Sequence, residues 1–204
     1  MPDGTPPRSP GRFVTLEGGE GSGKSTLARR LAEHLRGQGR DVELTREPGG
    51  SPGAEMVRHV LLSGAAEPLG PFAETILFAA ARDDHLETRI RPALARGAIV
   101  ICDRFADSTR AYQGALGGVE PEVVNAIERV VVGRTQPDLT LILDLPVAIA
   151  RARLDKRGEG PDRFEREAPD FHAKLRKAYL DLAIAQPHRC VVIDANASPD
   201  TVFG

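Results

Sequence analysis

The sequence predicts an α/β fold in three layers, with a five-stranded parallel sheet between helices on both faces. Two observations carry this prediction: short apolar runs alternate with longer stretches of helical periodicity, and a glycine-rich turn follows the first run. Alternating strands and helices are typical of a parallel sheet covered on both sides. The apolar runs are residues 13–16, 42–45, 98–102, 139–143 and 190–193. The helical stretches are residues 24–36, 54–62, 72–96, 121–132, 147–156 and 169–185.

Composition favours one domain that acts on small anions. A chain of 204 residues with 41% hydrophobic content suits a single core, which we expect over residues 11–204. Residues 1–10 contain four prolines and no apolar residue after Met1, so we expect a flexible tail. The formal net charge of -2 provides no general basic field, and we expect no nucleic-acid partner.

Cysteine use and hydropathy indicate a cytoplasmic protein. Cys102 and Cys190 each lie inside an apolar run, where buried thiols of reduced cytosolic proteins are found, so a disulfide is the less favoured interpretation. No stretch approaches the roughly 20 apolar residues of a membrane span. Residues 1–10 also lack the apolar centre of a signal peptide. We therefore expect no contact with a membrane.

The first strand leads into a phosphate-binding loop. Residues 18–25 read Gly-Gly-Glu-Gly-Ser-Gly-Lys-Ser and fit the pattern G-x-x-x-x-G-K-[ST] between a strand and a helix, which disfavours a chance match. Backbone N–H groups converge there at a helix N-terminus, where an anion is stabilised. We expect Lys24 to contact the outer phosphates of a nucleoside triphosphate and Ser25 to hold Mg²⁺. The other candidate residues for binding this triphosphate are Gly18, Gly19, Glu20, Gly21, Ser22, Gly23 and Thr26.

One residue of this loop looks unsuited to the task, because Glu20 places a carboxylate beside the phosphates. Exposure of Glu20 to solvent is the simplest alternative.

Charged residues also follow the second and third strands. Arg46 and Glu47 precede a Pro-Gly-Gly turn that directs this pair toward the cleft. Asp103 is suited to hold Mg²⁺ or its waters, and Arg104 to grip a phosphate in bidentate geometry. Because parallel strands end at one edge of the sheet, these groups should meet the phosphate loop. An ordinary surface ion pair between Asp103 and Arg104 is the alternative.

The last two strands carry weaker signals. Asp144 ends the fourth strand just before Pro146, where a helix cap is the simpler interpretation. Ser198, Pro199 and Asp200 start a helix after the fifth strand. The chain reaches Gly204 soon afterwards, so we expect this last helix to be cut short.

The third helical stretch carries a candidate base pocket. Phe78 and Arg82 lie four residues apart, so both face one side of the helix, and Ala81 is small enough for a planar ring to approach. We expect Phe78 to stack on a base and Arg82 to donate to its carbonyl group. Packing of Phe78 in the core is the alternative.

A basic cluster between Arg151 and Arg166 surrounds Gly158, Gly160 and Pro161. Because the glycines and the proline interrupt the helix, we predict a short arginine-rich lid at about residues 156–167, in preference to a solvated helix face. Such a lid closes over a nucleotide and neutralises the transferring phosphoryl group. The candidates nearest the break are Arg157 and Arg163.

The five histidines show no metal-ligand spacing and mostly fall on polar helix faces, so we assign them no function.

Six motifs in order carry a family resemblance. The strings Glu-Gly-Gly-Glu-Gly-Ser-Gly-Lys-Ser-Thr, Thr-Arg-Glu-Pro-Gly-Gly, Phe-Ala-Ala-Ala-Arg, Asp-Arg-Phe, Asp-Ser-Thr-Arg-Ala-Tyr-Gln-Gly and Asp-Arg-Phe-Glu begin at residues 17, 45, 78, 103, 107 and 162. Over nearly the whole chain they resemble bacterial-type thymidylate kinases, phosphate-loop enzymes that transfer the γ-phosphoryl group of ATP to dTMP, giving dTDP and ADP for dTTP biosynthesis. The resemblance also implies a homodimer packed through helices.

The resemblance implies a role for each residue that matches a motif. In the acceptor site, Arg104 and Arg58 would hold the phosphate of dTMP, Phe78 would stack on thymine and Arg82 would bind its O4. Glu47 belongs to the same site, Thr109 and Gln113 would reach the rest of the ring edge, and Tyr112 would crowd the 2′ carbon. Glu20 would contact the sugar 3′-hydroxyl or a magnesium water. The catalytic set is then Lys24, Arg104, Arg157, Arg163 and Glu20.

Two rival interpretations stay open on the sequence. One is a kinase for another nucleoside monophosphate or for a deoxynucleoside. The other is a nucleotide-dependent switch that hydrolyses GTP slowly. The guanine-reading string Asn-Lys-x-Asp is absent, and a switch gains nothing from Phe78, Arg82 and Tyr112.

Overall fold

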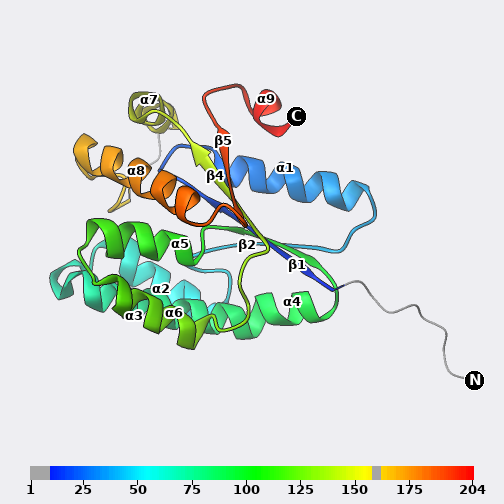
Figure 1. The fold of residues 1–204 in the computed structure, drawn as a ribbon, viewed down its shortest axis with the longest axis horizontal. Coiled ribbons are helices and arrows are strands. Elements are labelled where there is room, and N and C mark those ends of the chain that lie inside the picture. The colour runs from blue at the N-terminus through cyan, green and yellow to red at the C-terminus, as the bar shows by residue number, and fades with distance from the viewer. Residues whose placement is uncertain (1–9, 158–161) are drawn as a thin grey trace, which may run out of the picture.

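One parallel sheet runs through the computed structural model, which describes residues 10–157 and 162–204 (Figure 1). The strands are β1 (Arg12–Glu17), β2 (Val42–Arg46), β3 (Ile99–Asp103), β4 (Leu139–Asp144) and β5 (Cys190–Asp194). Their order across the sheet is β2-β3-β1-β4-β5, and every neighbouring pair is parallel. The predicted α/β fold with a five-stranded parallel sheet is confirmed.

Helices cover both faces of this sheet (Figure 1). One face packs against α1 (Lys24–Gly37) and the short α9 (Pro199–Phe203). The other helical elements of the described ranges are α2 (Pro52–Ser63), η1 (Glu67–Leu69), α3 (Gly70–His85), η2 (Leu86–Ile90), α4 (Arg91–Ala95), α5 (Ala106–Thr109), η3 (Arg110–Leu116), α6 (Pro121–Val131), α7 (Val147–Arg157) and α8 (Pro169–Ala185). Of these, η2, α4, α5 and α8 contribute to the core on the opposite face.

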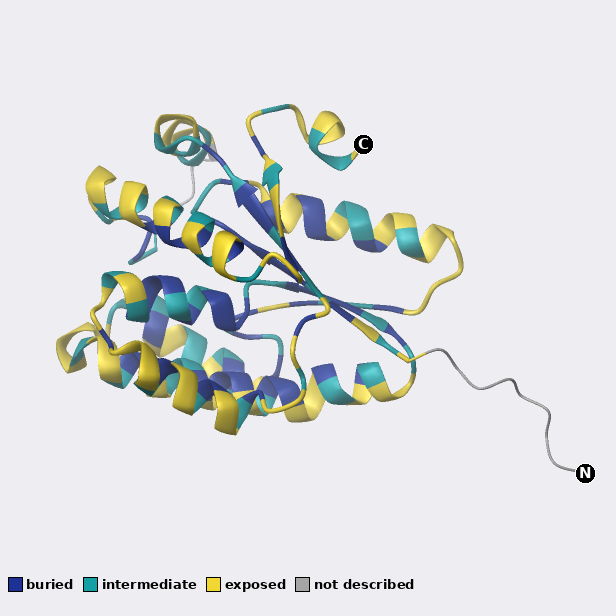
Figure 2. Cartoon of the chain, viewed as in Figure 1, coloured by how far each residue is buried: buried dark blue, intermediate teal, exposed yellow. Residues whose placement is uncertain are grey.

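The central strands β1, β3 and β4 are largely buried, as dark blue in Figure 2 shows, whereas the edge strand β5 leaves Val191 and Val192 exposed. Alternate residues of β1 serve the two cores, with Leu16 packed in the α1 layer and Phe13 in the layer of η2 and α4. Thr15 and Thr140 meet between β1 and β4, fully buried, and their hydroxyl groups form a 2.8 Å hydrogen bond. This pairing satisfies two polar groups within an apolar sheet.

Two predicted elements differ from the structure. The helix expected over residues 72–96 extends from Gly70 to Ala95, but the π-helical η2 interrupts it before Pro92. Proline lacks an N–H and crowds the carbonyl group four residues earlier, so a wider turn accommodates it. Residues 106–116, where the sequence gives no helical pattern, form α5 and η3. Their buried faces include Asp107, Thr109 and Gln113, so the apolar periodicity of a helix is missing.

Other expectations can be compared directly. Cys102 and Cys190 are both buried and free. Helix α9 begins where predicted, and the Ser198 hydroxyl oxygen accepts a 3.2 Å hydrogen bond from the Thr201 N–H. Across the described ranges, no helix is long and apolar enough to cross a membrane. Most of the predicted tail, residues 1–9, and residues 158–161 of the predicted lid fall outside those ranges.

Candidate active site

The phosphate loop joins β1 to α1 through three glycines with positive φ angles: 132° at Gly18, 71° at Gly21 and 98° at Gly23. A Cβ atom at Gly18 would lie 2.5 Å from the carbonyl oxygen of Leu143, so the loop has no room for a side chain there. Gly23 precedes α1, and no side chain caps that helix. Its first N–H groups are therefore available to an anion.

Lys24 is folded back over this loop. Its Nζ lies 2.7 Å from the carbonyl oxygen of Gly19, 3.1 Å from that of Gly18 and 3.3 Å from Ser22 Oγ. Burial and the nearby Arg104 lower the pKa of this ammonium group, which negative neighbours only partly oppose. An anion in the loop would give Lys24 the counter-charge that burial makes favourable.

Ser25 and Asp103 bring an oxygen pair together beside the loop. The Ser25 hydroxyl, at the start of α1, donates to Asp103 Oδ2 at the end of β3 over 2.5 Å. Hydroxyl and carboxylate oxygens are ligands that suit Mg²⁺. The described residues contain no cluster of three or more His, Cys, Asp or Glu able to hold a metal. A magnesium ion here would complete its coordination with phosphate oxygens and water.

Arg104 neutralises Glu20, the residue that looked unsuited to the loop. Arg104 Nη2 donates to Glu20 Oε1 over 2.6 Å, and the Tyr112 hydroxyl donates to the same oxygen over 2.8 Å. Burial alone would raise the pKa of Glu20, but Arg104, Lys24 and Tyr112 outweigh it and lower the pKa to about 2. Glu20 is therefore a paired carboxylate inside the site, so solvent exposure does not explain it.

The backbone of Arg104 is unusual for a residue with a side chain, because its φ angle is 71°. Such a conformation costs of the order of 1–3 kcal/mol and persists where surrounding contacts fix it. Here the Arg104 N–H donates to the Leu16 carbonyl oxygen over 2.9 Å, and the Cys102 thiol donates to the Arg104 carbonyl oxygen. Its Nη1 reaches the Gly18 carbonyl oxygen at 3.2 Å and the Tyr179 hydroxyl at 3.0 Å. The strained turn thus directs the guanidinium group at the phosphate loop.

Glu17 stabilises the same turn by hydrogen bonds to residues that follow Arg104. Its carboxylate, fully buried at the end of β1, accepts hydrogen bonds from the Phe105 N–H at 2.8 Å, the Ser108 hydroxyl at 2.7 Å and the Tyr179 hydroxyl at 3.1 Å. Burial, with a further contribution from the nearby Asp107, raises the pKa of Glu17 to about 7. Sequence reasoning gave Glu17 no role, although a carboxylate that ends a buried strand is a signal in itself.

Replacing Glu17 with glutamine should flatten the pH dependence of stability. The folded protein retains the Glu17 proton up to a pH of about 7, whereas the unfolded chain loses it near 4.5. This contribution to the free energy of unfolding is complete below the lower value and is lost as the pH rises through the higher one. In Glu17→Gln, Oε1 still accepts from the N–H groups of Phe105 and Ser108, and the hydroxyl groups of Ser108 and Tyr179 can accept from Nε2.

The measurement is the unfolding temperature of both proteins between about pH 5 and about pH 8. Wild type should lose stability relative to Glu17→Gln over this interval. Parallel curves would show that Glu17 is ionised throughout and would contradict the assignment.

Arg82, Gln113 and Phe78 line the same cavity as the phosphate loop. Arg82 Nε donates to Glu47 Oε2 over 2.7 Å, and Nη2 donates to Thr109 Oγ1 over 3.2 Å. Its Nη1 has no partner among the described residues. Phe78 is only partly buried and lines the cavity, so it is not simply a core residue.

A buried chain of hydrogen bonds fixes Arg82 from behind. Glu47 uses one carboxylate oxygen for Arg82 and the other for His85 Nδ1, at 3.1 Å. His85 Nε2 in turn lies 2.6 Å from Thr45 Oγ1. His85 is completely buried, which corrects the interpretation of the histidines as polar surface residues without a role. No short motif signals such a residue, because its partners come from a distant strand and turn.

Three predicted arginines remain, and the structure places one of them in the cavity and another outside it. Arg58 lines the cavity and donates to the Pro48 carbonyl oxygen over 2.6 Å. Arg163 is not brought to the phosphate loop: its Nη1 pairs with Glu74 on α3, and its Nε lies 3.5 Å from Glu67. The side chain of Arg157 lies outside the described residues.

One cavity of about 790 Å³ connects these groups. It extends from Arg153, Ala195 and Val202, past the phosphate loop, to Phe78 and Gln113. The volume lies in the upper part of the usual range for ligand sites, and the polar groups of the cavity gather at the carboxyl ends of the strands. The cavity offers space on both sides of the loop, which suits two substrates that meet at the phosphates.

A phosphate loop that shares one cavity with an aromatic ring and fixed hydrogen-bonding side chains is typical of phosphate-loop kinases of small molecules. The family model described as Thymidylate kinase matches residues 16–203. Thymidylate kinases of Bradyrhizobium diazoefficiens and Nitrobacter hamburgensis are 60% and 62% identical, over 95% and 94% of this chain and 86% and 84% of theirs. The crystal structure of thymidylate kinase from Ehrlichia chaffeensis superposes with a TM-score of 0.78 at 33% identity and 96% coverage of both chains. The chain belongs to the thymidylate kinase family, whose members phosphorylate dTMP to dTDP.

Proposed function

We propose that the γ-phosphoryl group of ATP passes to dTMP inside this cavity, with ATP and dTMP on opposite sides of the phosphate loop. The observation that carries the proposal is the single cavity that joins the loop to the pocket of Phe78, Arg82 and Gln113. The end near Arg153 and Val202 is left for the base of ATP.

The polarity of the acceptor pocket supports thymine as the base. Within the described chain Arg82 Nη1 is a free donor, and Gln113 Nε2 points to Glu74 at 3.3 Å, which leaves the carbonyl oxygen of Gln113 as an acceptor. This donor and acceptor complement the O4 atom and the N3–H group of thymine. Cytosine presents the reverse pattern, an amino group and an unprotonated nitrogen. Phe78 supplies the stacking surface.

The sugar and phosphate of dTMP would lie between this pocket and the loop. Tyr112 and Glu20, joined by their 2.8 Å hydrogen bond, form the wall there. Tyr112 would disfavour a ribonucleotide by crowding the 2′ carbon, and Glu20 would accept from the 3′-hydroxyl group. Arg104 and Arg58 supply positive charge for the acceptor phosphate.

The chemistry requires charge neutralisation more than proton abstraction. The second pKa of a phosphate monoester is about 6, so the acceptor is largely ionised at neutral pH and needs no strong general base. The obstacle is repulsion between two anionic groups. Lys24 and Arg104 reduce it, hold both phosphates in line and stabilise the charge of a loose transition state.

Ser25 and Asp103 would hold Mg²⁺ together with the phosphates of ATP. The ion supplies a positive charge next to the oxygens of the transferring group. Arg157 stays the predicted lid cation, while Arg163 serves Glu74 in the conformation described here.

Turnover with ATP and Mg²⁺ tests the proposal. Consumption of ATP should require dTMP and be slower with dUMP, dGMP, CMP or thymidine. Faster turnover with one of these would favour the related kinases. Preference for GTP, without acceleration by any monophosphate, would favour a nucleotide-dependent switch and contradict the proposal.

Replacing Arg82 with alanine should chiefly weaken acceptor binding. The variant loses the donor to O4, so KM for dTMP should rise about ten- to a hundredfold while KM for ATP stays unchanged. Glu47 also loses a buried partner, so the protein should be less stable and is best assayed at low temperature. A fall in kcat with unchanged KM for dTMP would contradict this role.

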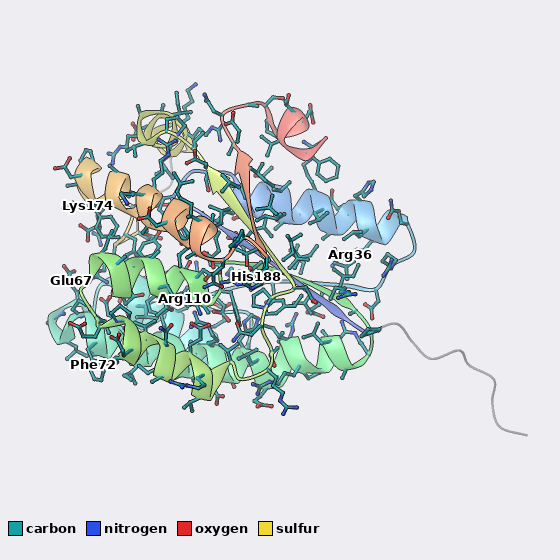
Figure 3. All side chains as sticks on the ribbon, viewed as in Figure 1. Arg36, Glu67, Phe72, Arg110, Lys174 and His188 are labelled. Atoms are coloured by element: carbon teal, nitrogen blue, oxygen red, sulfur yellow. The ribbon has the colours of Figure 1, made fainter. Side chains whose placement is uncertain are left out.

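We further propose a cytoplasmic homodimer. Exposed apolar side chains gather on the neighbouring helices α2 and α3 and just before α3, and Phe72 projects at the edge of the molecule (Figure 3). They are Met56, Val60, Leu69, Phe72 and Ile76. A patch of this kind is typical of a surface covered by a partner, and the family resemblance makes a second copy the expected one. Sedimentation analysis of the purified chain tests this proposal.

A further inference from the structure

Glu74 lies directly behind the acceptor pocket and does not line it. Its side chain, on α3, is 4% exposed. Oε2 accepts a hydrogen bond from Gln113 Nε2 at 3.3 Å, and Oε1 accepts from Arg163 Nη1. Both oxygens are therefore engaged by buried or partly buried partners, and the carboxylate is held from two sides.

The charge of Glu74 decides which end of the Gln113 amide faces the cavity. A carboxylate only accepts hydrogen bonds, so the NH₂ group of Gln113 must point toward it. The carbonyl oxygen then faces the cavity that Gln113 lines. No donor in the described part of the chain engages that oxygen, so it is available to a ligand.

We propose that Glu74 is a specificity-determining positioning residue that makes this kinase select a 4-oxo pyrimidine and reject a 4-amino pyrimidine. The proposal rests on the proposed function, because it assumes that the acceptor base lies against Phe78, Arg82 and Gln113. Thymine donates its N3–H to the fixed oxygen of Gln113. Cytosine would place its N3 lone pair against that oxygen and its amino group against the donors of Arg82. Sites with fixed hydrogen-bond polarity reject mismatched analogues strongly, because buried groups are left unpaired.

Arg163 holds the other carboxylate oxygen of Glu74, Oε1. Its guanidinium group packs 4.8 Å from the centre of the Phe164 ring, and Phe164 itself lines the cavity. With Arg163 in place, Glu74 cannot turn away from Gln113 without breaking this ion pair. The polarity of the pocket is therefore set by a pair that does not contact the base.

The decisive experiment replaces Glu74 with glutamine and compares kcat/KM for dTMP and for dCMP. The two side chains have the same shape, but glutamine offers either a donor or an acceptor to Gln113, so the Gln113 amide can turn over and accommodate cytosine. The preference for dTMP should fall by about tenfold or more, while KM for ATP stays unchanged. Glu67→Gln is the matched control, because Glu67 also lies near Arg163, at 3.5 Å, but its side chain is exposed at the edge of the molecule (Figure 3), whereas the hydrogen bond of Gln113 goes to Glu74. Its preference should equal that of the wild type.

The outcomes separate the inference from the proposed function. A folded Glu74→Gln enzyme with the wild-type preference for dTMP would overturn the role of Glu74 and leave the proposed function intact. A wild-type protein that does not phosphorylate dTMP would overturn the function, and with it the inference. If Glu74→Gln fails to fold because Arg163 loses its counter-charge, the double variant Glu74→Gln/Arg163→Met removes the stranded cation. Its preference should fall in the same way, since a general loss of rate affects both substrates alike.

Discussion

Replacing Arg104 with methionine will nearly abolish transfer to dTMP and will also destabilise the fold. The variant loses a cation that lies against the loop and that we propose to contact the acceptor phosphate, so kcat/KM should fall by about 10³-fold or more. Glu20 loses its 2.6 Å partner in a site where burial already disfavours its charge. The two side chains keep 13% and 18% exposure, so we expect a loss of about 2 kcal/mol in the free energy of unfolding, less than for a fully buried pair.

The double variant Arg104→Met/Glu20→Gln separates these two effects. The neutral amide that replaces the Glu20 carboxylate needs no counter-ion, so the free energy of unfolding in urea should recover most of the loss, while transfer to dTMP should stay low. Recovery of activity in the double variant would show that Arg104 acts only by neutralising Glu20. That result would contradict its proposed contact with the acceptor.

The sequence predicts those parts of this site that lie in contiguous motifs. The phosphate loop and the Asp103-Arg104 pair are contiguous, and their positions at the ends of β1 and β3 follow from the alternation of strands and helices. Glu20 is a residue whose environment contiguous motifs do not predict. Its partner Arg104 lies 84 residues further along the chain, so only the folded structure shows why a carboxylate is tolerated in the loop.

The supporting residues were missed for the same reason. His85, Glu74 and Glu17 act through partners on other elements, and each is a buried polar side chain on an otherwise ordinary helix or strand. Local patterns treat such residues as surface, although burial with satisfied hydrogen bonds makes them part of the site.

A second buried network explains why residues 106–116 escaped prediction as helix. Arg189, just before β5, forms a bidentate pair with Asp107 at 2.7 and 2.8 Å, and Asp107 also binds Arg110. Arg110 continues to Glu128 on α6 at 2.8 Å. These ion pairs accompany the apolar contacts of Ala106, Ala111 and Tyr112 on the inner side of α5 and η3. The elements that carry Thr109, Tyr112 and Gln113 are thus fixed by charge pairing that hydrophobic periodicity does not report.

Replacing Lys24 with methionine should remove most of the turnover while leaving the fold intact. Lys24 is the cation of the phosphate loop, and loss of one fixed donor to a transition-state oxyanion typically costs about 10²- to 10³-fold in kcat. Burial and Arg104 lower the pKa of this ammonium group, so the cost of burying its charge offsets much of what its hydrogen bonds within the loop contribute to stability. Methionine fills a similar volume, and the unfolding temperature without nucleotide should change little.

Stabilisation by ATP supplies the independent measurement. The unfolding temperature of the wild type should rise as ATP and Mg²⁺ are added, because only the folded protein binds them. The unfolding temperature of Lys24→Met should rise less. Lys177→Met is the matched control, since Lys177 is exposed on α8 and pairs only with Asp181 among the residues described. It should behave like the wild type in both assays. A Lys24→Met enzyme with kcat within a factor of about two of the control would mean that the ammonium group, although buried in the loop, does not act on the transferring phosphoryl group.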